Sequence, residues 1–252
     1  MESSLYQTGV RVMVDKYLEE KSKEVRDYGE YWSASSAGYC MRKNIFDRLK
    51  VTPTNSDARK TRVFEVGHIF HGWIQDITKS AGVSVSQEGE LQDEVLMIRG
   101  HYDDIIKTDN GLILYDYKAA HSRSFTYKKG KEMSYYHKMQ LGTYMYMLRE
   151  IEEYKDLAEG RICSISKDDL RMDETQLLWN QGLEETVAGY WTTLNEYWNA
   201  KKIPACTCHE HEGGFMAKDK YNPYYFQGES CSLTWYKLWK EGKHQEYIKK
   251  EG

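Results

Sequence analysis

Residues 111–120, GLILYDYKAA, form an apolar pattern typical of a strand, yet they hold an acid and a base, Asp116 and Lys118. Side chains alternate between the two faces of a strand, so both charged groups share a face with Leu112 and Leu114. Such a pair is either a structural ion pair within a sheet or the centre of an active site. The choice depends on what else reaches the same face.

A second carboxylate, Asp103, reaches this face if the preceding strand folds back as a hairpin. The segment KTDNG contains an Asn-Gly pair at 110–111, which is a strong hairpin signal. With a two-residue loop at 110–111, Asp103 lies opposite Lys118, and with the loop at 109–110 it lies opposite Asp116. Cross-strand partners share a face, so either register brings two carboxylates and an ammonium group together.

Two neighbouring carboxylates repel each other unless one is protonated or a cation lies between them. A hard divalent ion with oxygen ligands, such as Mg²⁺, is the natural partner for Asp103 and Asp116. Lys118 could then orient a water molecule and help to deprotonate it, or neutralise charge on a phosphate. The alternative is structural: an edge-strand ion pair, with Asp103 and Asp104 flanking a solvated turn.

The elements that must position these groups alternate between helices and strands. Apolar periodicity and start signals predict helices over 5–28, after the serines at 33–36, and over 59–82, 134–154 and 173–202. Strands are expected over 83–91, 94–106, 112–119 and 160–167. This order predicts an α/β fold with a mixed β-sheet flanked by helices.

Composition restricts the class of protein further. The 252 residues carry a net charge of −4, so any binding to nucleic acid needs a local basic patch. No apolar run approaches the length of a membrane span, and the N-terminal segment lacks the apolar centre of a signal peptide, which favours a cytoplasmic protein. We expect a single domain with N-terminal helices (1–82), a core (83–202) and a cysteine-containing C-terminal tail (203–252).

Four short motifs follow one another along the chain: GHIFH (67–71), GHYD (100–103), DYK (116–118) and QLGTY (140–144). Their order, spacing and expected context resemble the RecB-like branch of the PD-(D/E)XK nuclease superfamily, whose pattern is G-x-x-x-H, G-x-x-D, D/E-x-K and Q-x-x-x-Y. Each motif alone is weak, and the four together are specific. The resemblance implies a metal-dependent nuclease whose expected core is residues 83–202.

Roles for individual residues follow from this resemblance. It implies that Asp103 and Asp116 bind Mg²⁺ or Mn²⁺, and that His71 and the Tyr117 carbonyl complete the protein ligands. Lys118 would position the attacking water.

The helix motif adds Gln140 and Tyr144, which are four residues apart and so lie on one helix face, where they would contact the site or the DNA strand. His68 competes with His71 as the functional histidine, and Glu88 or Glu90 could add a ligand.

A basic and aromatic segment lies between the hairpin and the Gln140 helix. Its basic residues could hold phosphates while its aromatic rings stack on bases. An exposed polar loop is the alternative. The residues are Arg123, Lys128, Lys129, Lys131 and Lys138, with Phe125, Tyr127, Tyr135 and Tyr136.

The chain has five cysteines, an odd number, and we expect it to be in a reducing compartment. Both points argue against a disulfide framework. Cys40 lies upstream of the motifs, and Cys206, Cys208 and Cys231 lie downstream. This arrangement resembles the iron–sulfur members of the RecB-like family, which include CRISPR-associated exonucleases and AddB-type subunits. It implies a [4Fe–4S] cluster that ties the tail to the N-terminal helices. Cys163 is expected to be a core thiol.

Zinc is the competing interpretation of the same region. Its ligands would be Cys206, Cys208, His209 and His211, because cysteine and histidine both suit Zn²⁺. Adjacent ligands within CTCHEH are, however, awkward to arrange around one tetrahedron.

These features together predict a divalent-metal-dependent DNA nuclease, an exonuclease on single strands or duplex ends, with a structural [4Fe–4S] cluster. The chain has no Walker-type helicase motif, so it would act alone or with recombination or CRISPR adaptation proteins. One alternative is a non-catalytic nucleic-acid-binding or scaffold protein of the same fold, although a binder has no need to keep repelling carboxylates together. The other is a restriction-type endonuclease, for which no separate recognition domain is visible.

Overall fold

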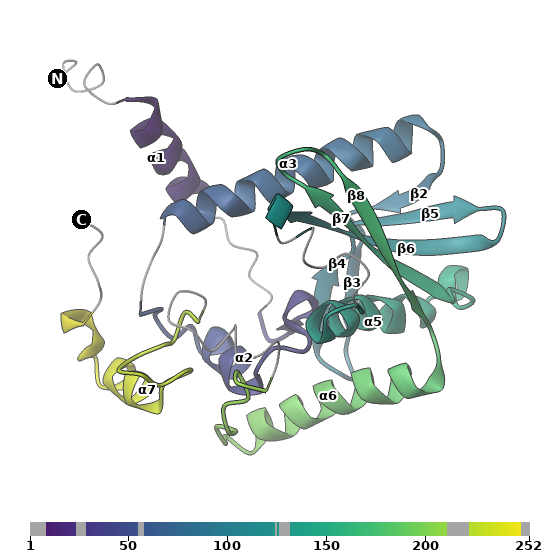
Figure 1. Ribbon diagram of the computed structural model, residues 1–252. Coiled ribbons are helices and arrows are strands. Elements are labelled where there is room, and N and C mark those ends of the chain that lie inside the picture. Colours follow the sequence, from purple (N-terminus) through teal and green to yellow (C-terminus); the bar gives the residue numbers. More distant parts are fainter. Residues whose placement is uncertain are drawn as a thin grey trace.

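The computed structural model describes residues 9–23, 29–54, 58–123, 125, 132–210 and 222–247 (Figure 1). Helices lie on both sides of the larger of two mixed β-sheets, so the expected α/β fold is confirmed. Within these residues, no helix has the length and apolar character needed to span a membrane.

The larger sheet has five strands in the order β2-β5-β6-β7-β8. Strands β6 and β7 are parallel, and the other neighbouring pairs are antiparallel. The central strand is β6, the one that carries Asp116 and Lys118, so its backbone is paired on both sides. The bounds are Ser84–Gln87 (β2), Asp104–Thr108 (β5), Gly111–Ala120 (β6), Glu159–Ser166 (β7) and Met172–Leu178 (β8).

The smaller sheet has the order β1-β4-β3, with bounds Trp32–Ser33 (β1), Ile98–His101 (β4) and Glu90–Asp93 (β3). The expected strands 83–91 and 94–106 are therefore each divided between two sheets. The chain changes sheet at Glu88, where the backbone has a φ of 50°, and again between β4 and β5. A continuous strand-like pattern does not reveal such a change of sheet, because both halves bury one face.

The helices are α1 (Val10–Lys23), α2 (Met41–Arg48), α3 (Ala58–Ser80), α5 (Tyr135–Arg149), α6 (Gln181–Asn199) and α7 (Leu233–Lys240). The helix expected over 173–202 is wrong in its first part, where the chain forms β8. That strand is at the edge of the sheet and alternates between exposed and partly buried residues, so it lacks an apolar run. Helix α6 begins only after Asn180, whose side chain accepts a hydrogen bond from the Leu183 N–H at 2.9 Å.

The serines at 33–36 are not the start of α2. Ala34–Ser36 form a short 3₁₀ turn, and Cys40 is the residue that precedes the helix. The expected helix is therefore present, but it begins at Met41.

Layers of helix cover both faces of the large sheet (Figure 1). On one face, α5 packs against β7 and α6 packs against α5, and Leu114 of β6 belongs to the same core cluster as fully buried Met139 and Leu141. On the other face, Ile74 of α3 contacts a cluster that includes Tyr117. Successive residues of β6 therefore face different helices: Tyr117 faces α3, and Asp116 faces α5, whose Gln140 contacts it.

The C-terminal tail packs on α2 and the loop after it. The Trp235 Nε1–H donates to the Thr52 carbonyl at 2.7 Å, and the Thr54 N–H donates to the Pro223 carbonyl at 2.8 Å. Phe46 stacks on Tyr236 with ring centroids 5.1 Å apart. The tail is thus attached to the N-terminal helices, which is the architecture expected from the cysteines.

Candidate functional site

The hairpin between β5 and β6 sets the position of the two motif aspartates. Thr108 pairs with Gly111, so the two-residue loop is at 109–110. Asp104 pairs with Tyr115, and one residue further the same register puts Asp103 level with Asp116. The second of the two expected registers is therefore the one observed, and the register that puts Asp103 opposite Lys118 is wrong.

Asp116 is the most enclosed of these groups, with an exposed fraction of 2%. The Lys118 Nζ lies 2.6 Å from its Oδ2, and the Gln140 Nε2–H donates to its Oδ1 at 3.2 Å. Burial acts to lower the pKa of Lys118, but the nearby carboxylates of Asp116 and Asp103 outweigh burial and raise it. The lysine is thus held as a cation beside the carboxylate.

Asp103 is held by backbone as well as by side chains. Its Oδ2 accepts the Tyr117 N–H at 2.7 Å, and its carbonyl accepts the Gln75 Nε2–H at 2.9 Å. Burial, and then the charge of Asp116, raise the pKa of Asp103 from 3.8 to about 8. A carboxyl group with this pKa would ionise at neutral pH if a cation replaced its proton.

His71 projects from α3 toward the same carboxylate. Its Nδ1 lies 3.5 Å from Asp103 Oδ2. Burial and the charge of Lys118 lower the pKa of His71, which keeps the imidazole neutral, as a metal ligand must be. His68 instead has a 69% exposed side chain next to Glu65, so the structure brings only His71 to the aspartates.

Gln75, one helical turn after His71, is a residue of the site that the sequence motifs do not predict. It donates to Glu88 Oε1 at 3.0 Å as well as to Asp103, and the Glu88 N–H donates to the Asp103 carbonyl at 3.1 Å. Glu88 therefore borders the site, whereas Glu90 forms an ion pair with Arg99. The i, i+4 spacing from His71 was a signal that could have identified Gln75.

Asp104 does not flank a solvated turn, as the structural alternative supposed. It is fully buried next to α3 and β2. Its carboxylate accepts hydrogen bonds from the Thr78 Oγ1, Ser84 Oγ, Gln87 Nε2 and Tyr117 Oη groups, at 2.6, 2.6, 3.2 and 3.0 Å. This network fixes the start of β5 immediately after Asp103.

Tyr144, the last residue of the helix motif, lies in the main core with 4% exposure. Its ring is close to Gly100, where an added Cβ would come within 3.0 Å of Tyr144 Cε1. Its expected role at the site stays a prediction, as does that of the Tyr117 carbonyl.

The aromatic and basic segment is only partly described, because Tyr127, Lys128, Lys129 and Lys131 lie outside the described residues. Phe125 is 6% exposed, and the guanidinium of Arg171 covers its ring at 5.3 Å, so it is too enclosed to stack on a base. Tyr136, on the first turn of α5, stacks on Tyr39 with ring centroids 5.4 Å apart.

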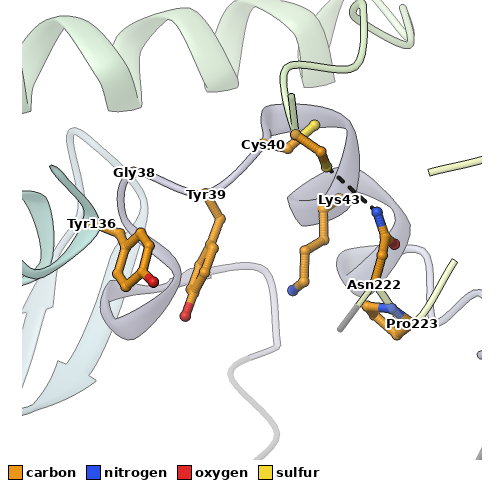
Figure 2. Close-up of a pocket in the computed structure, with 8 residues that line it drawn as sticks. Gly38, Tyr39, Cys40, Lys43, Tyr136, Asn222 and Pro223 are labelled. Atoms are coloured by element: carbon orange, nitrogen blue, oxygen red, sulfur yellow. Dashed lines mark hydrogen bonds between the residues drawn. The ribbon is translucent and has the colours of Figure 1, made fainter. Parts of the chain in front are cut away.

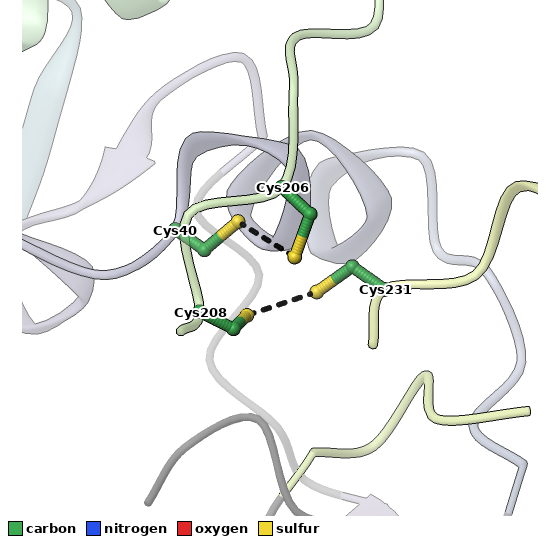
Figure 3. A group of neighbouring side chains, drawn as sticks. All are labelled: Cys40, Cys206, Cys208 and Cys231. Carbon is green, nitrogen blue, oxygen red and sulfur yellow. Dashed lines mark hydrogen bonds between the residues drawn. The ribbon is translucent and has the colours of Figure 1, made fainter. Parts of the chain in front are cut away.

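Four cysteines from distant parts of the chain converge in a separate group (Figure 3). Their Sγ atoms all lie within 4.8 Å of one another, which confirms the expected grouping of Cys40, Cys206, Cys208 and Cys231. Cys40 and Cys206 are 3.9 Å apart, and Cys208 and Cys231 are 3.5 Å apart. Four thiols in this arrangement are a donor set for a soft or borderline metal centre.

Neighbouring groups support the thiols. The Asn222 Nδ2–H₂ group lies 3.5 Å from Cys208 Sγ and 3.4 Å from Cys231 Sγ, and the Thr207 N–H donates to Cys40 Sγ at 3.4 Å. The Nε2 of His209 lies 3.5 Å from Ser230 Oγ, and His211 lies outside the described residues. Cys163 is separate from this group and buried in the core as expected, where burial raises its pKa to about 12.

Comparison with known proteins identifies the fold family. The model of the PD-(D/E)XK nuclease superfamily matches residues 13–188, well over half of the chain. No curated protein matches the chain.

Among solved structures, the chain is similar to SSO0001, with a TM-score of 0.51 and 18% identity over 79% of this chain and 94% of that one. It is also similar to the alkaline exonuclease LHK-Exo of Laribacter hongkongensis, with a TM-score of 0.46 and 15% identity over 68% and 89% of the two chains. The LHK-Exo complex with dAMP gives 0.49 and 17%, over 69% and 90%. At 18% identity the likeness to SSO0001 is one of fold.

Proposed function

Because the chain belongs to the PD-(D/E)XK nuclease superfamily, we propose that it is a DNA nuclease dependent on Mg²⁺ or Mn²⁺. We propose further that it belongs to the RecB-like branch and that it acts as an exonuclease on single-stranded DNA or duplex ends. The observation that carries the proposal is the convergence of Asp103, Asp116 and Lys118, with a neutral His71 beside them.

The donor set suits a hard divalent cation. Asp103 and Asp116 offer carboxylate oxygens, His71 offers an imidazole nitrogen, and the Tyr117 carbonyl is the remaining proposed ligand. The raised pKa of Asp103 shows that this pocket disfavours a second unshared negative charge, which a cation would relieve. When bound, such an ion makes water more acidic and neutralises charge on the phosphate.

The chain's own residues supply the rest of the proposed hydrolysis. Lys118 orients the water for in-line attack at phosphorus and stabilises the negative charge that develops on the phosphate oxygens. Gln140 fixes the Asp116 carboxylate through its hydrogen bond, so that both oxygens keep their direction. The Tyr117 N–H does the same for Asp103.

The four cysteines are proposed to hold a structural [4Fe–4S] cluster, in line with the iron–sulfur members that the sequence resembles. The support for the cluster is that resemblance. Zinc held by the same four thiolates, in place of the set with His209 and His211, is the alternative, and its support is the short Sγ–Sγ spacing of 3.5 and 3.9 Å, which suits a single tetrahedral ion. Either centre would join the tail to α2.

Metal analysis of protein purified without air separates the two centres. About four irons and four inorganic sulfides per chain, with broad absorption in the visible range, would support the cluster. One zinc per chain in a colourless protein would refute the cluster and support the zinc site. In both cases Cys231→Ser should release the metal, whereas Cys163→Ser should retain it.

Labelled linear DNA, single- and double-stranded, and closed circular DNA test the activity itself. With Mn²⁺ or Mg²⁺, wild type should degrade the linear substrates from their ends and leave the circle intact. Lys118→Ala should lower the rate by roughly 10²- to 10⁴-fold, while Lys107→Ala, on the exposed part of the neighbouring strand, should not change it. Cleavage of the circular DNA would refute the exonuclease mode and indicate an endonuclease. Intact DNA in all samples would refute nuclease activity.

We also propose that the protein acts in the cytoplasm, alone or with recombination or CRISPR adaptation proteins. The support is the resemblance of its motifs and cysteines to those families. Co-purification with tagged partners of these two kinds would test the association.

A further inference from the structure

The aromatic residues beside the cysteine group are used in contacts within the chain. Figure 2 shows the Tyr39 ring between Tyr136 and Lys43, in the hollow next to Cys40. The two tyrosine rings stack with centroids 5.4 Å apart, and the Lys43 Nζ lies 5.1 Å from the Tyr39 centroid. Both faces of Tyr39 are therefore covered, and this hollow offers no surface to a partner. The apolar side chains of α1 and α3 differ, because solvent reaches many of them.

Helix α3 is apolar on two sides. Its inner side packs on the large sheet through Phe70 and Ile74. Its outer side carries an apolar stripe with spacings of three, four and four residues, which is one face of a helix. The stripe is Val66, Ile69, Trp73 and Ile77, with exposed fractions from 37% at Val66 to 63% at Ile69. A helix that is apolar on opposite sides is typical of a buried helix, so the composition of α3 predicts a cover for this outer stripe.

Helix α1 adds a second exposed apolar surface. It packs against the N-terminal half of α3, where the Lys21 Nζ lies 2.8 Å from Glu65 Oε1, and Leu18 between these contacts is buried. Figure 1 shows the first turns of α1 extending beyond α3, away from the two sheets. The exposed apolar residues of α1 include Val10, Met13, Val14 and Tyr17, with exposed fractions from 40% at Val14 to 76% at Val10. The apolar surface of α3 thus continues onto α1.

The area of this surface matches that of a stable protein interface. From their exposed fractions, the eight residues of the two helices present roughly 700–800 Å² of mostly apolar surface to solvent. A monomeric protein rarely exposes a continuous apolar patch of more than a few hundred Å². A standard interface, in contrast, buries about 800 Å² on each partner. The surface of α1 and α3 is therefore large enough to be one half of a stable dimer.

The stripe on α3 is also arranged so that it can pack on a copy of itself. In an antiparallel helix pair, a residue before the two-fold axis meets the residue the same number of positions after it. Ile69 and Trp73 are each two residues from position 71, and Val66 and Ile77 are five and six residues from it. An axis at this level therefore places Ile69 against Trp73 of the partner subunit. The antiparallel order also pairs opposite ends of the two helix dipoles.

We propose that the protein forms a two-fold symmetric homodimer through antiparallel packing of the outer stripe of α3, with α1 of each copy beside the C-terminal half of the other copy's α3. The inference does not depend on the proposed nuclease function. His71 and Trp73 are two residues apart, which is about 200° around the helix. The interface is thus on the side of α3 away from His71, and both carboxylate sites of the dimer stay open.

Sedimentation equilibrium of the full chain measures the dimer directly. Interfaces of this size have a Kd of about 1 μM or below, so wild type at about 50 μM should have twice the chain mass of 29.7 kDa. Ile69→Asp should raise the Kd roughly 30-fold or more, because the substitution acts at both copies of a central contact. Met13→Asp on α1 should raise it roughly 5-fold or more. Val95→Asp is the matched control, since Val95 is 87% exposed on the turn between β3 and β4 and should leave the Kd unchanged.

Mixing two variants tests the antiparallel register. Ile69→Asp and Trp73→Lys should each be mostly monomeric alone, because each places two charges against apolar side chains of the partner subunit. In a mixed dimer, the new aspartate of one copy meets the new lysine of the other, and the second Ile69–Trp73 contact is intact. An equimolar mixture should therefore regain the dimer mass. A parallel arrangement would bring like positions together, and the mixture would then regain nothing.

Three results would overturn the inference. One is wild type that sediments as a monomer, or as three or more chains, at this concentration. Another is a dimer whose Kd neither Ile69→Asp nor Met13→Asp changes, which would place the interface elsewhere on the protein. The third is a mixture of the two α3 variants that stays monomeric while each variant keeps the helical circular dichroism and the metal content of wild type.

Discussion

Binding of Mn²⁺ at the carboxylate site should depend on pH with a midpoint near 8. The pKa of Asp103 is raised to about 8 by burial and by Asp116, so at pH 7 about nine in ten molecules carry a proton that the ion must displace. Between pH 7 and pH 6 the apparent affinity should fall about tenfold, which corresponds to about 1.4 kcal/mol. Above pH 9 the affinity should become constant. Burial and the charge of Lys118 lower the pKa of His71, which weakens proton competition at this ligand.

Isothermal titration calorimetry in buffers of different ionisation enthalpy measures both quantities. We expect Mn²⁺ binding to release a proton at pH 7, and to release less as the pH rises above about 8. Asp103→Asn should abolish the proton release, and Asp109→Asn, in the exposed hairpin loop, should leave it unchanged. An affinity that is constant between pH 6 and pH 8, with no proton release, would refute the reasoning.

The same shift predicts the pH dependence of stability without the metal. A carboxyl group whose pKa is higher in the folded state than in the unfolded state binds more protons when folded, so its contribution is present at low pH and is lost as the pH rises from about 4 to about 8. Mn²⁺ should therefore raise the melting temperature more at pH 8.5 than at pH 6.

Three further changes give direct tests. Gln140→Ala removes the hydrogen bond to Asp116 and should weaken Mn²⁺ binding roughly 10- to 100-fold by calorimetry, with DNA affinity retained; an unchanged affinity would show that this contact is incidental. Asp104→Asn turns amide hydrogens toward the groups that donate hydrogen bonds to this carboxylate, so it should lower the free energy of unfolding, measured in urea, by about 1–3 kcal/mol. A decrease smaller than a few tenths of a kcal/mol would contradict the network. Gly38→Ala should destabilise the protein more than Gly29→Ala, because both have positive φ but only the Gly38 position is crowded; equal losses would contradict the close approach to α5.

The central hairpin could be predicted because its information is local. Alternation along β6 places Asp116 and Lys118 together, and a two-residue turn leaves only two registers for Asp103. The choice between those registers needed the structure, since KTDNG permits the loop at either position. The grouping of the four cysteines came from resemblance, and the structure confirms it.

Features that depend on distant contacts could not be read from the sequence. The sequence of β8 predicts a helix and not a strand, because an edge strand needs no apolar run. Asp104 appeared solvated because its partners come from α3 and β2, about 20 residues away in the chain.

The most direct test of the proposed hydrolysis is the rate of Mn²⁺-dependent cleavage of an end-labelled single strand by Asp116→Asn and by Asp109→Asn. Asp116 carries the contacts to Lys118 and Gln140, whereas Asp109 lies in the exposed loop of the same hairpin. We expect wild type and Asp109→Asn to cleave at equal rates and Asp116→Asn to be slower by roughly 10²-fold or more. Cleavage by Asp116→Asn at the wild-type rate would contradict the assignment of the active site.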